Sequence, residues 1–480
     1  MLWRQGLVPR RSKSQKAEKI SPEVRDRVAE LVAQGQLQKA CNALVDKPPV
    51  EVTPEVIREM KNKHPSERTP IDWSELRQIH PSAAPTVDEG CVQRMIMSFA
   101  KGSGGGPSGL KPQHIKDALQ PGFRDELVRV LTEVVIMLSK GDAPSCIRPF
   151  LNGASLVALP KNNGGLRPIA VGEVLRRLVS KCVLDTMGSE VRDRLEPIQV
   201  GVGTRGGCEA TVHAARQWMA RHRADPERLL VKLDMENAFN CLDRQAMLDA
   251  VRSTFPYLAP WVDFTYGNHS GLWMDGHLLH SQRGVQQGDP LGPLLFSLAL
   301  QVAIEKVKAR ADFESPGDLD FMAFYLDDGT LAGPGDAVVW FAVELEKELN
   351  AIGLSVNWGV GKSEAIPPAM EACVVDRSRL PHLLFNNTGC FTLLGDPIGN
   401  DAFCEAASEE RRQKAAALFT ALPDLEDPQL AYILLKHCAS FCKMSYSLRV
   451  VPRDSHVQAL TRFDNDIRRA FAASPLSLRT

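Results

Sequence analysis

The chain has 480 residues, 44% hydrophobic and 24% charged, with a formal net charge of −1. These values are typical of a soluble globular protein of two or three subdomains, and no apolar run approaches the roughly 20 residues of a membrane span. The basic N-terminal segment lacks the apolar stretch of a secretory signal. Eleven scattered cysteines without a CxxC pair suit a reducing, intracellular compartment, either nucleus or cytoplasm.

The first half of the chain predicts a mixture of helices and strands. Residues 1–85 are polar and interrupted by prolines, so we expect an N-terminal extension that is partly disordered and partly helical. A Gly/Pro-rich loop at 102–119 leads into helical periodicity at 124–139. The segment 151–171 predicts two strands joined by a turn at 162–165, and helices are expected at 172–187 and 209–223.

The second half predicts short strands that alternate with helices. Strands are expected at 229–234, 356–358 and 391–394, with hairpins at 272–285 and 319–333. Helices are expected from about 240, at 294–311, at 338–352 and, between prolines, from 404 onward. This order predicts an α+β fold with an antiparallel sheet and helices on one side.

Three aspartates in or next to the predicted strands are candidate metal ligands. Asp327 and Asp328 are adjacent in an apolar hairpin, where two carboxylates would repel each other and lose hydration. A divalent cation would restore the balance of charge. Asp234 ends another apolar strand, so the sequence predicts three carboxylates on two strands, which suits a two-metal phosphoryl-transfer site. Singly, each could instead be a turn or capping carboxylate.

Six segments in order resemble the blocks of a reverse transcriptase, most like those of non-LTR retrotransposons. They are KNNGGLRPIAV, LLVKLDMENAFN, RGVQQGDPLGPLLFSL, FYLDDGTL, GLSVNWGVGKSE and LLGDPIG, which are spread over roughly residues 155–400. GSGGGPSGLKPQHI is similar to the Gly-Pro motif that precedes them in the family.

The resemblance implies a right-hand polymerase fold with fingers, palm and a partial thumb. We expect the extension at 1–85, fingers and palm at 86–390, and a primer-grip hairpin with a helical thumb-like region at 391–480. The implied activity is RNA-directed DNA polymerisation: addition of dNTPs to a DNA or RNA primer on an RNA template, with no membrane involved. Two Mg²⁺ ions, or Mn²⁺ in their place, are the implied cofactors, held by Asp234, Asp327 and Asp328.

The resemblance also assigns roles to residues around the aspartates. Phe239 would exclude a ribose 2′-hydroxyl, although it could be a core residue. Gln287, or the adjacent Gln286, and Gly288 would approach the nucleotide, while Asp289 shapes the turn that follows. Lys161, Arg167 and Tyr325 would make further contacts with the substrate. Lys362 would supply a proton to pyrophosphate. Leu394 and Gly395 would contact the primer. A solvated hairpin end for Lys161 and a surface position for Lys362 are the structural alternatives.

Three other functions remain open from the sequence. An RNA-dependent RNA polymerase would need a sugar pocket open to the 2′-hydroxyl, which Phe239 disfavours. A non-catalytic nucleic-acid-binding descendant of a polymerase would not require three clustered acids. A group II intron maturase would be accompanied by an intron-binding or nuclease segment, which the sequence does not identify.

Overall fold

The computed structural model describes residues 20–45, 50–72, 86–161, 164–376 and 378–474. The predicted disorder at the start of the chain and the Asn162–Asn163 half of the predicted turn lie outside these ranges. The chain forms two units. One contains residues 49–407 and 447–456, and the other contains 1–48, 408–446 and 457–480.

A five-stranded sheet of order β6-β7-β3-β8-β9 lies in the larger unit, where the sequence predicts the palm. Its strands are β3 (Arg228–Leu233), β6 (Phe321–Tyr325), β7 (Asp328–Pro334), β8 (Glu364–Ile366) and β9 (Leu384–Phe385). β3 lies between β7 and β8 and is antiparallel to both, while only β8 and β9 run parallel. Leu229, Leu230, Val231 and Leu233 of β3 are buried, because this central strand is covered on both faces.

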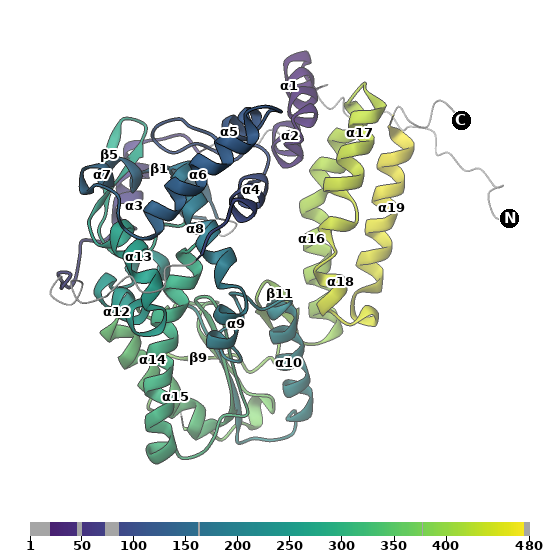
Figure 1. The fold of residues 1–480 in the computed structure, drawn as a ribbon. Helices are drawn as coiled ribbons and strands as arrows, with labels where there is room; N and C mark the ends of the chain where they lie inside the picture. The colour runs from purple at the N-terminus through teal and green to yellow at the C-terminus, as the bar shows by residue number, and fades with distance from the viewer. Residues whose placement is uncertain (1–19, 46–49, 73–85, 162–163, 377, 475–480) are drawn as a thin grey trace. The chain divides into compact units, whose positions relative to one another are not determined.

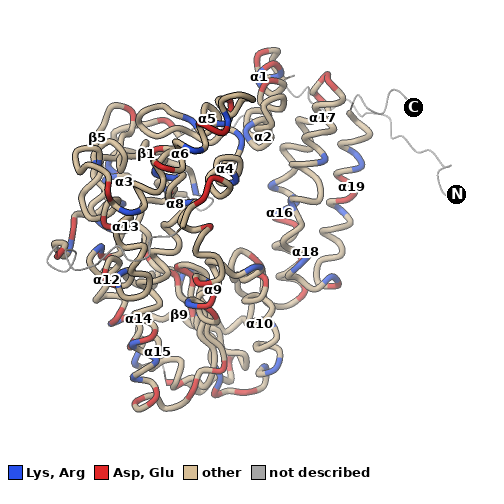
Figure 2. Tube along the Cα trace, viewed as in Figure 1, with Lys and Arg blue, Asp and Glu red and all other residues tan. Residues whose placement is uncertain are grey.

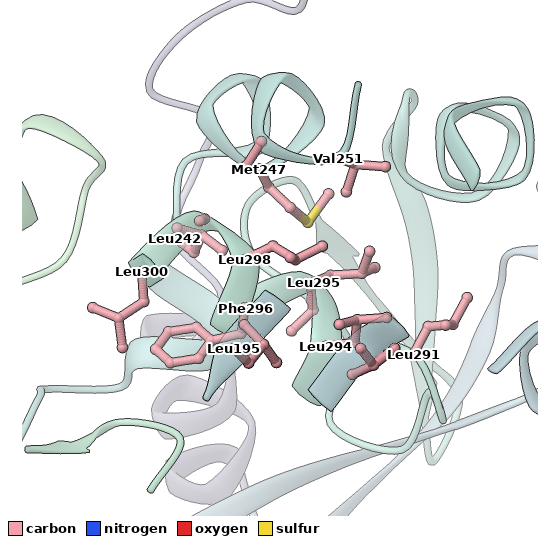
Figure 3. Packing of buried hydrophobic residues seen from close by; sticks show 14 of the residues in the cluster. Leu195, Leu242, Met247, Val251, Leu291, Leu294, Leu295, Phe296, Leu298 and Leu300 are labelled. Atoms are coloured by element: carbon pink, nitrogen blue, oxygen red, sulfur yellow. The ribbon is translucent and has the colours of Figure 1, made fainter. Parts of the chain in front are cut away.

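Two long helices, α14 (Gly292–Glu314) and α15 (Gly335–Ala351), contribute to the core beneath this sheet. α14 buries residues around its first four turns, including Leu294, Leu295 and Phe296, as expected for a helix that is apolar on most sides. Figure 3 shows these side chains packed with Leu195 and with residues near α12 (Arg244–Thr254). The strands that carry the acidic residues therefore pack on this core.

A second sheet, of order β2-β1-β4-β5, belongs to the predicted fingers. Its strands are β1 (Ala154–Pro160), β2 (Leu166–Gly172), β4 (Ser270–Met274) and β5 (His277–Ser281). β1 pairs antiparallel with β2 and parallel with β4. Met60 of α3 (Pro54–Asn62) packs into the apolar side of this sheet with Leu156, Leu272 and Leu279.

The remaining elements of the larger unit are mostly helical. They are α4 (Glu89–Met97), α5 (Pro112–Ala118), α6 (Arg124–Ser139), α7 (Arg148–Leu151), α8 (Val174–Met187), α9 (Ser189–Leu195), α10 (Gly207–Arg221), α11 (Ala238–Cys241), α13 (Ala259–Tyr266) and α18 (Ser447–Val450). A small antiparallel hairpin, β10 (Phe391–Leu393) with β11 (Asp396–Ile398), follows the palm sheet in sequence.

The smaller unit is helical. It contains α1 (Pro22–Ala33), α2 (Leu37–Leu44), most of α16 (Asp401–Ala421), α17 (Pro428–Leu434) and α19 (Val457–Ala473). α16, α17 and α19 lie alongside one another (Figure 1), and their apolar faces share one core that includes Phe419, Leu434 and Phe463. Arg412 of α16 forms an ion pair with Asp466 of α19, and the α16 residue Glu409 accepts from Arg462 at 2.9 Å.

Charges of both signs are interspersed along the chain (Figure 2), in keeping with its net charge of −1. All eleven cysteines are free thiols. Among the described residues, no helix has both the length and the apolar character needed to cross a bilayer.

Most elements occur where the sequence predicts them, and α6 has the predicted ends. The strand predicted at 356–358 is wrong: Val356 makes only an isolated bridge with Met235. The strand beside β3 on this side of the sheet is instead β8, whose three residues pair with Leu230–Lys232. β8 is too short to show a periodic pattern, and Pro367 follows it directly.

Candidate active site

Asp234 lies where β3 meets the β6–β7 hairpin. Leu233 pairs with Gly329, so the next position along β3 brings Asp234 opposite Asp328. Tyr325 pairs with Asp328, which leaves Leu326 and Asp327 as a two-residue turn between β6 and β7. Asp234 is therefore brought together with Asp327 and Asp328, which lie about ninety residues later in the sequence, at one end of the palm sheet.

The side chain of Asp234 is held by residues near β8. Asn357 Nδ2 donates to Asp234 Oδ2 at 3.0 Å, and Lys362 Nζ lies 3.5 Å from the same oxygen. The backbone is held as well, because Asp234 N donates to Ser363 Oγ at 2.9 Å. Asn357 and Ser363 were not singled out from the sequence, although both belong to the GLSVNWGVGKSE block.

The ionised forms of the two hairpin aspartates, Asp327 and Asp328, are disfavoured by their surroundings. Burial, followed by the nearby charges of Asp327 and Asp234, raises the pKa of Asp328 to about 7. Burial also raises the pKa of Asp327, with Asp234 adding to the shift while Arg167 and Lys161 oppose it. The site therefore favours additional positive charge next to its carboxylates.

This donor set fits a divalent cation in its chemistry, because hard cations prefer carboxylate oxygens. Within the described ranges, however, no three His, Cys, Asp or Glu side chains are grouped closely enough to hold a metal ion as they stand. The Asp234 carboxylate is instead in contact with Asn357 and Lys362.

A cavity of about 360 Å³ opens beside these carboxylates. Six of the predicted site residues line it, namely Asp234, Tyr325, Asp328, Lys362, Leu394 and Gly395. Of the other predicted residues, all of which the structure describes, none is among those that line this cavity. The predicted primer-contacting turn thus borders the same space as Asp234 and Asp328, two of the three predicted metal ligands.

Lys232 also lines this cavity and was not predicted. Its Nζ lies 2.7 Å from Glu364 and 3.3 Å from the Thr392 carbonyl oxygen, so it connects β3, β8 and β10. Because side chains alternate along a strand, Lys232 shares a face with Asp234, and this period of two was the available sequence signal.

The predicted primer-grip turn is tight. Leu393 pairs with Asp396, and both intervening residues have positive φ, 48° at Leu394 and 86° at Gly395. Two consecutive residues of this kind are typical of a type I′ hairpin turn, which favours glycine. The buried Asp396 accepts from Ser447 Oγ at 3.0 Å.

The two predicted cations of the fingers are exposed at the β1–β2 hairpin. Partial burial and then the charges of Lys63, Lys362 and Arg167 lower the pKa of Lys161, while Asp234 opposes this shift. The structure therefore brings Lys161 and Arg167 into the electrostatic environment of the aspartates.

Phe239 lies half-buried in α11 and stacks on Phe296, with ring centroids 4.8 Å apart. Its carbonyl oxygen accepts from Val285 N at 2.7 Å. Beside it, a Cβ on Gly284 would lie 2.0 Å from that same oxygen, so only glycine fits there. The Phe239 ring is thus held by its stacking on Phe296, and the Phe239 backbone is held by its hydrogen bond with Val285.

Gln287 and Gly288 lie against β2, the strand that carries Arg167. Ala170 N donates to Gln287 O at 2.8 Å, and Gly288 has a φ of 140°. A Cβ on Gly288 would lie 2.2 Å from Ala170 O, which explains the glycine. The Gln286 side chain instead has a structural role, because it is 4% exposed and donates to Asn152 O and Ser270 Oγ.

A buried network that the sequence did not reveal supports this loop. Arg176, 1% exposed, donates to Gln286 Oε1 at 2.8 Å and to Asp289 Oδ2 at 2.9 Å. Tyr266 also donates to Asp289 Oδ2, and Asp289 Oδ1 accepts from Leu291 N at the start of α14. Asp289 therefore shapes the turn, as predicted, but its partner Arg176 comes from a distant helix.

The family model "Reverse transcriptase (RNA-dependent DNA polymerase)" matches residues 159–366. This range contains β3, the aspartate hairpin and the loop at Gln287. Residues 159–366 are a reverse transcriptase domain. This match confirms the predicted resemblance. The pairing of β6, β7, β3 and β8 confirms the predicted α+β plan with its mainly antiparallel palm sheet.

Two relatives of the reverse transcriptase domain are retrotransposon proteins. The retrotransposable element SLACS 132 kDa protein of Trypanosoma brucei gambiense is 28% identical over 246 residues, which are 50% of this chain and 19% of that protein. The Pol polyprotein from the type-2 retrotransposable element R2DM of Drosophila melanogaster is 26% identical over 271 residues, 52% of this chain and 24% of that protein. The matched region thus spans less than a quarter of either relative.

Among solved structures, a telomerase from Candida albicans superposes with a TM-score of 0.38 and 12% identity, covering 69% of this chain and 60% of that one. At that score the likeness supports no conclusion about function.

Proposed function

We propose that this chain is an RNA-directed DNA polymerase of a retroelement, which adds dNTPs to a primer 3′-hydroxyl on an RNA template. The observation that carries the proposal is the meeting of Asp234 with Asp327 and Asp328 at one end of the palm sheet, inside a reverse transcriptase domain. The raised pKa values of Asp327 and Asp328 support it, because the carboxylates are arranged as if for a cation.

Asp234, Asp327 and Asp328 would hold Mg²⁺ or Mn²⁺, which supplies charge compensation for the triphosphate and lowers the pKa of the attacking hydroxyl. Arg167 and Lys161 would bind the triphosphate oxygens from the fingers. Lys362 would donate a proton from Nζ to the departing pyrophosphate.

Selection and positioning of the substrates would fall to other residues. The Phe239 ring would leave no room for a 2′-hydroxyl, which favours deoxynucleotides. Gln287 and Gly288 would approach the nucleotide, and Tyr325 would contribute to the same pocket. Leu394 and Gly395 would contact the primer backbone beside the cavity that they share with Asp234.

Primer extension on poly(rA)/oligo(dT) with dTTP and Mg²⁺ tests this proposal, with Asp327→Asn/Asp328→Asn as the inactive comparison. Extension by the parent chain and not by the double variant is the expected result. Equal extension by both would refute the assignment of the aspartates. If neither protein extends the primer but both bind RNA, the non-catalytic nucleic-acid-binding alternative replaces the proposal.

A further inference from the structure

The turn that presents Asp327 contains an unfavourable backbone conformation. Leu326, the residue before Asp327, has a φ of 58°. Side chains with a Cβ rarely adopt this region, and a branched apolar residue gains no local hydrogen bond there. Because Leu326 is joined directly to Asp327, the direction of the Asp327 carboxylate depends on whether this conformation is maintained.

The side chain of Gln199 holds both backbone polar groups of Leu326. Gln199 Oε1 accepts from Leu326 N at 2.8 Å, and Gln199 Nε2 donates to Leu326 O at 3.1 Å. Gln199 is 1% exposed, so water does not readily replace these bonds. The Gln199 side-chain amide thus satisfies both the N–H and the C=O of Leu326, as a neighbouring strand does for a residue in a sheet.

The segment that carries Gln199 is itself fixed against β6. Phe324 N donates to Ile198 O at 2.7 Å, and Val200 N donates to Phe324 O at 2.8 Å. Gly201 N donates to Gln199 Oε1 at 3.0 Å, which orients the amide. A Cβ on Gly201 would lie 2.6 Å from Leu326 N, so this segment fits closely over the turn.

We infer that Gln199 is a positioning residue for the proposed polymerase site, which holds the Leu326 turn so that Asp327 faces Asp234. The inference rests on the proposed function for its catalytic meaning. Gln199 acts through the backbone of Leu326 and contacts no reacting group. Its loss would therefore weaken metal binding while leaving primer and template contacts intact.

Hydrogen exchange tests the structural part without requiring any activity. In Gln199→Met, which keeps the side-chain length, the Leu326 amide should exchange roughly tenfold faster, because one buried hydrogen bond is lost. Gln199→Glu keeps an acceptor for this amide and should retain most of its protection. Gln301 is also a buried glutamine, but it lies in α14, so Gln301→Met should leave the exchange rate of the Leu326 amide unchanged. Parental exchange at Leu326 in Gln199→Met would overturn the inference.

A Mg²⁺ titration of primer extension tests the functional part. Gln199→Met should raise the half-saturating Mg²⁺ concentration roughly tenfold with an unchanged Kd for the primer–template, and Gln301→Met should change neither. Unchanged Mg²⁺ dependence in Gln199→Met would overturn the positioning role. A parent chain without activity would refute the proposed function, and the exchange measurement would still decide whether Gln199 holds the turn.

A second variant decides the question if Gln199→Met does not fold. Gly201→Ala places a methyl group against Leu326 N and should displace the turn without removing the amide. It should accelerate exchange at Leu326 and raise the Mg²⁺ requirement in the same direction. Parental values of both in Gly201→Ala would refute the inference.

Discussion

Lys362 Nζ lies 3.5 Å from the carboxylate of Asp234, although the two residues are far apart in sequence. A turn explains the contact. Lys232 pairs with Glu364 of β8, and beyond that pair Asn357 N donates to Asp234 O at 2.7 Å, so the turn between Asn357 and β8 brings Lys362 beside Asp234. Asp234 therefore has a cation on its β8 side and the acidic hairpin on its β7 side.

Replacement of Lys362 tests whether this cation contributes to the chemistry. Lys362→Ala should lower kcat for dNTP addition about 100-fold with little change in primer–template affinity, because a proton donor is lost. Lys362→Arg should recover only part of the rate, since a guanidinium does not readily release its proton. Lys347→Ala removes an exposed lysine of α15 and serves as the control. Single-nucleotide incorporation rates give the answer, and a parental kcat for Lys362→Ala would make Lys362 a surface residue.

The stacking of Phe239 on Phe296 predicts a defined effect on sugar selection. Phe239→Ala should lower the preference for dTTP over UTP on a poly(rA) template about tenfold or more, because the space above Phe296 becomes open. The ratio of kcat/KM for the two nucleotides measures this. Phe313→Ala, which removes a ring that is 90% exposed, is the control. An unchanged ratio in Phe239→Ala would mean that the ring is only a packing residue.

The buried pair Arg176–Asp289 predicts a large effect on stability. Arg176→Met should lower the free energy of unfolding by about 3–5 kcal/mol, because the Asp289 carboxylate loses its buried cation. The exposed pair Arg129–Glu133 offers a matched comparison, in which Arg129→Met should cost about 0.5 kcal/mol or less. Urea denaturation distinguishes the two variants. Similar midpoints would contradict a structural role for Arg176 beneath the Gln287 loop.

The helical unit predicts a dependence of stability on pH. Hydrogen bonds from Arg412, and then from Arg462 and Gln413, lower the pKa of Glu409 to about 2 against the opposing effect of desolvation. A lowered carboxyl pKa contributes stability above the ordinary value near 4.5, and this contribution is lost as the pH falls toward 2. Glu409→Gln should therefore lower the free energy of unfolding at pH 7 by about 1 kcal/mol, since this group is partly exposed, and Tm should fall with it. The difference in Tm between the variant and the parent should shrink as the pH approaches 2.

A double-variant comparison controls for effects unrelated to this pair. If Glu409 and Arg412 act together, Glu409→Gln and Arg412→Gln should be less than additive at pH 7 and additive near pH 2. A Tm difference that does not change with pH would show that Glu409 contributes by packing alone.

Local pattern predicted much of this fold because the elements concerned are long or strongly marked. The helix at 124–139 has a clear period, and the hairpin around Asp327 alternates apolar residues around an acidic turn. Asp234 was identifiable because it directly follows the buried strand β3. In each case, the information lies within one short segment.

The features that the sequence did not reveal depend on distant partners. Arg176 lies on a helix where an arginine would ordinarily face solvent, and only the fold shows it bonded to Asp289. Likewise, Gln199 contacts Leu326 across 127 positions, and no local pattern marks it. Asn357 was assigned to a strand, whereas its side chain holds Asp234.

The most direct test of the central claim is the rate of RNA-templated dNTP addition by Asp234→Asn relative to the parent chain. We expect this variant to lose incorporation while keeping the parental thermal unfolding, because only a carboxylate at the end of β3 is removed. Asp275→Asn, in the exposed turn between β4 and β5, should retain the parental rate. Parental incorporation by Asp234→Asn would contradict the assignment of this site as the polymerase centre.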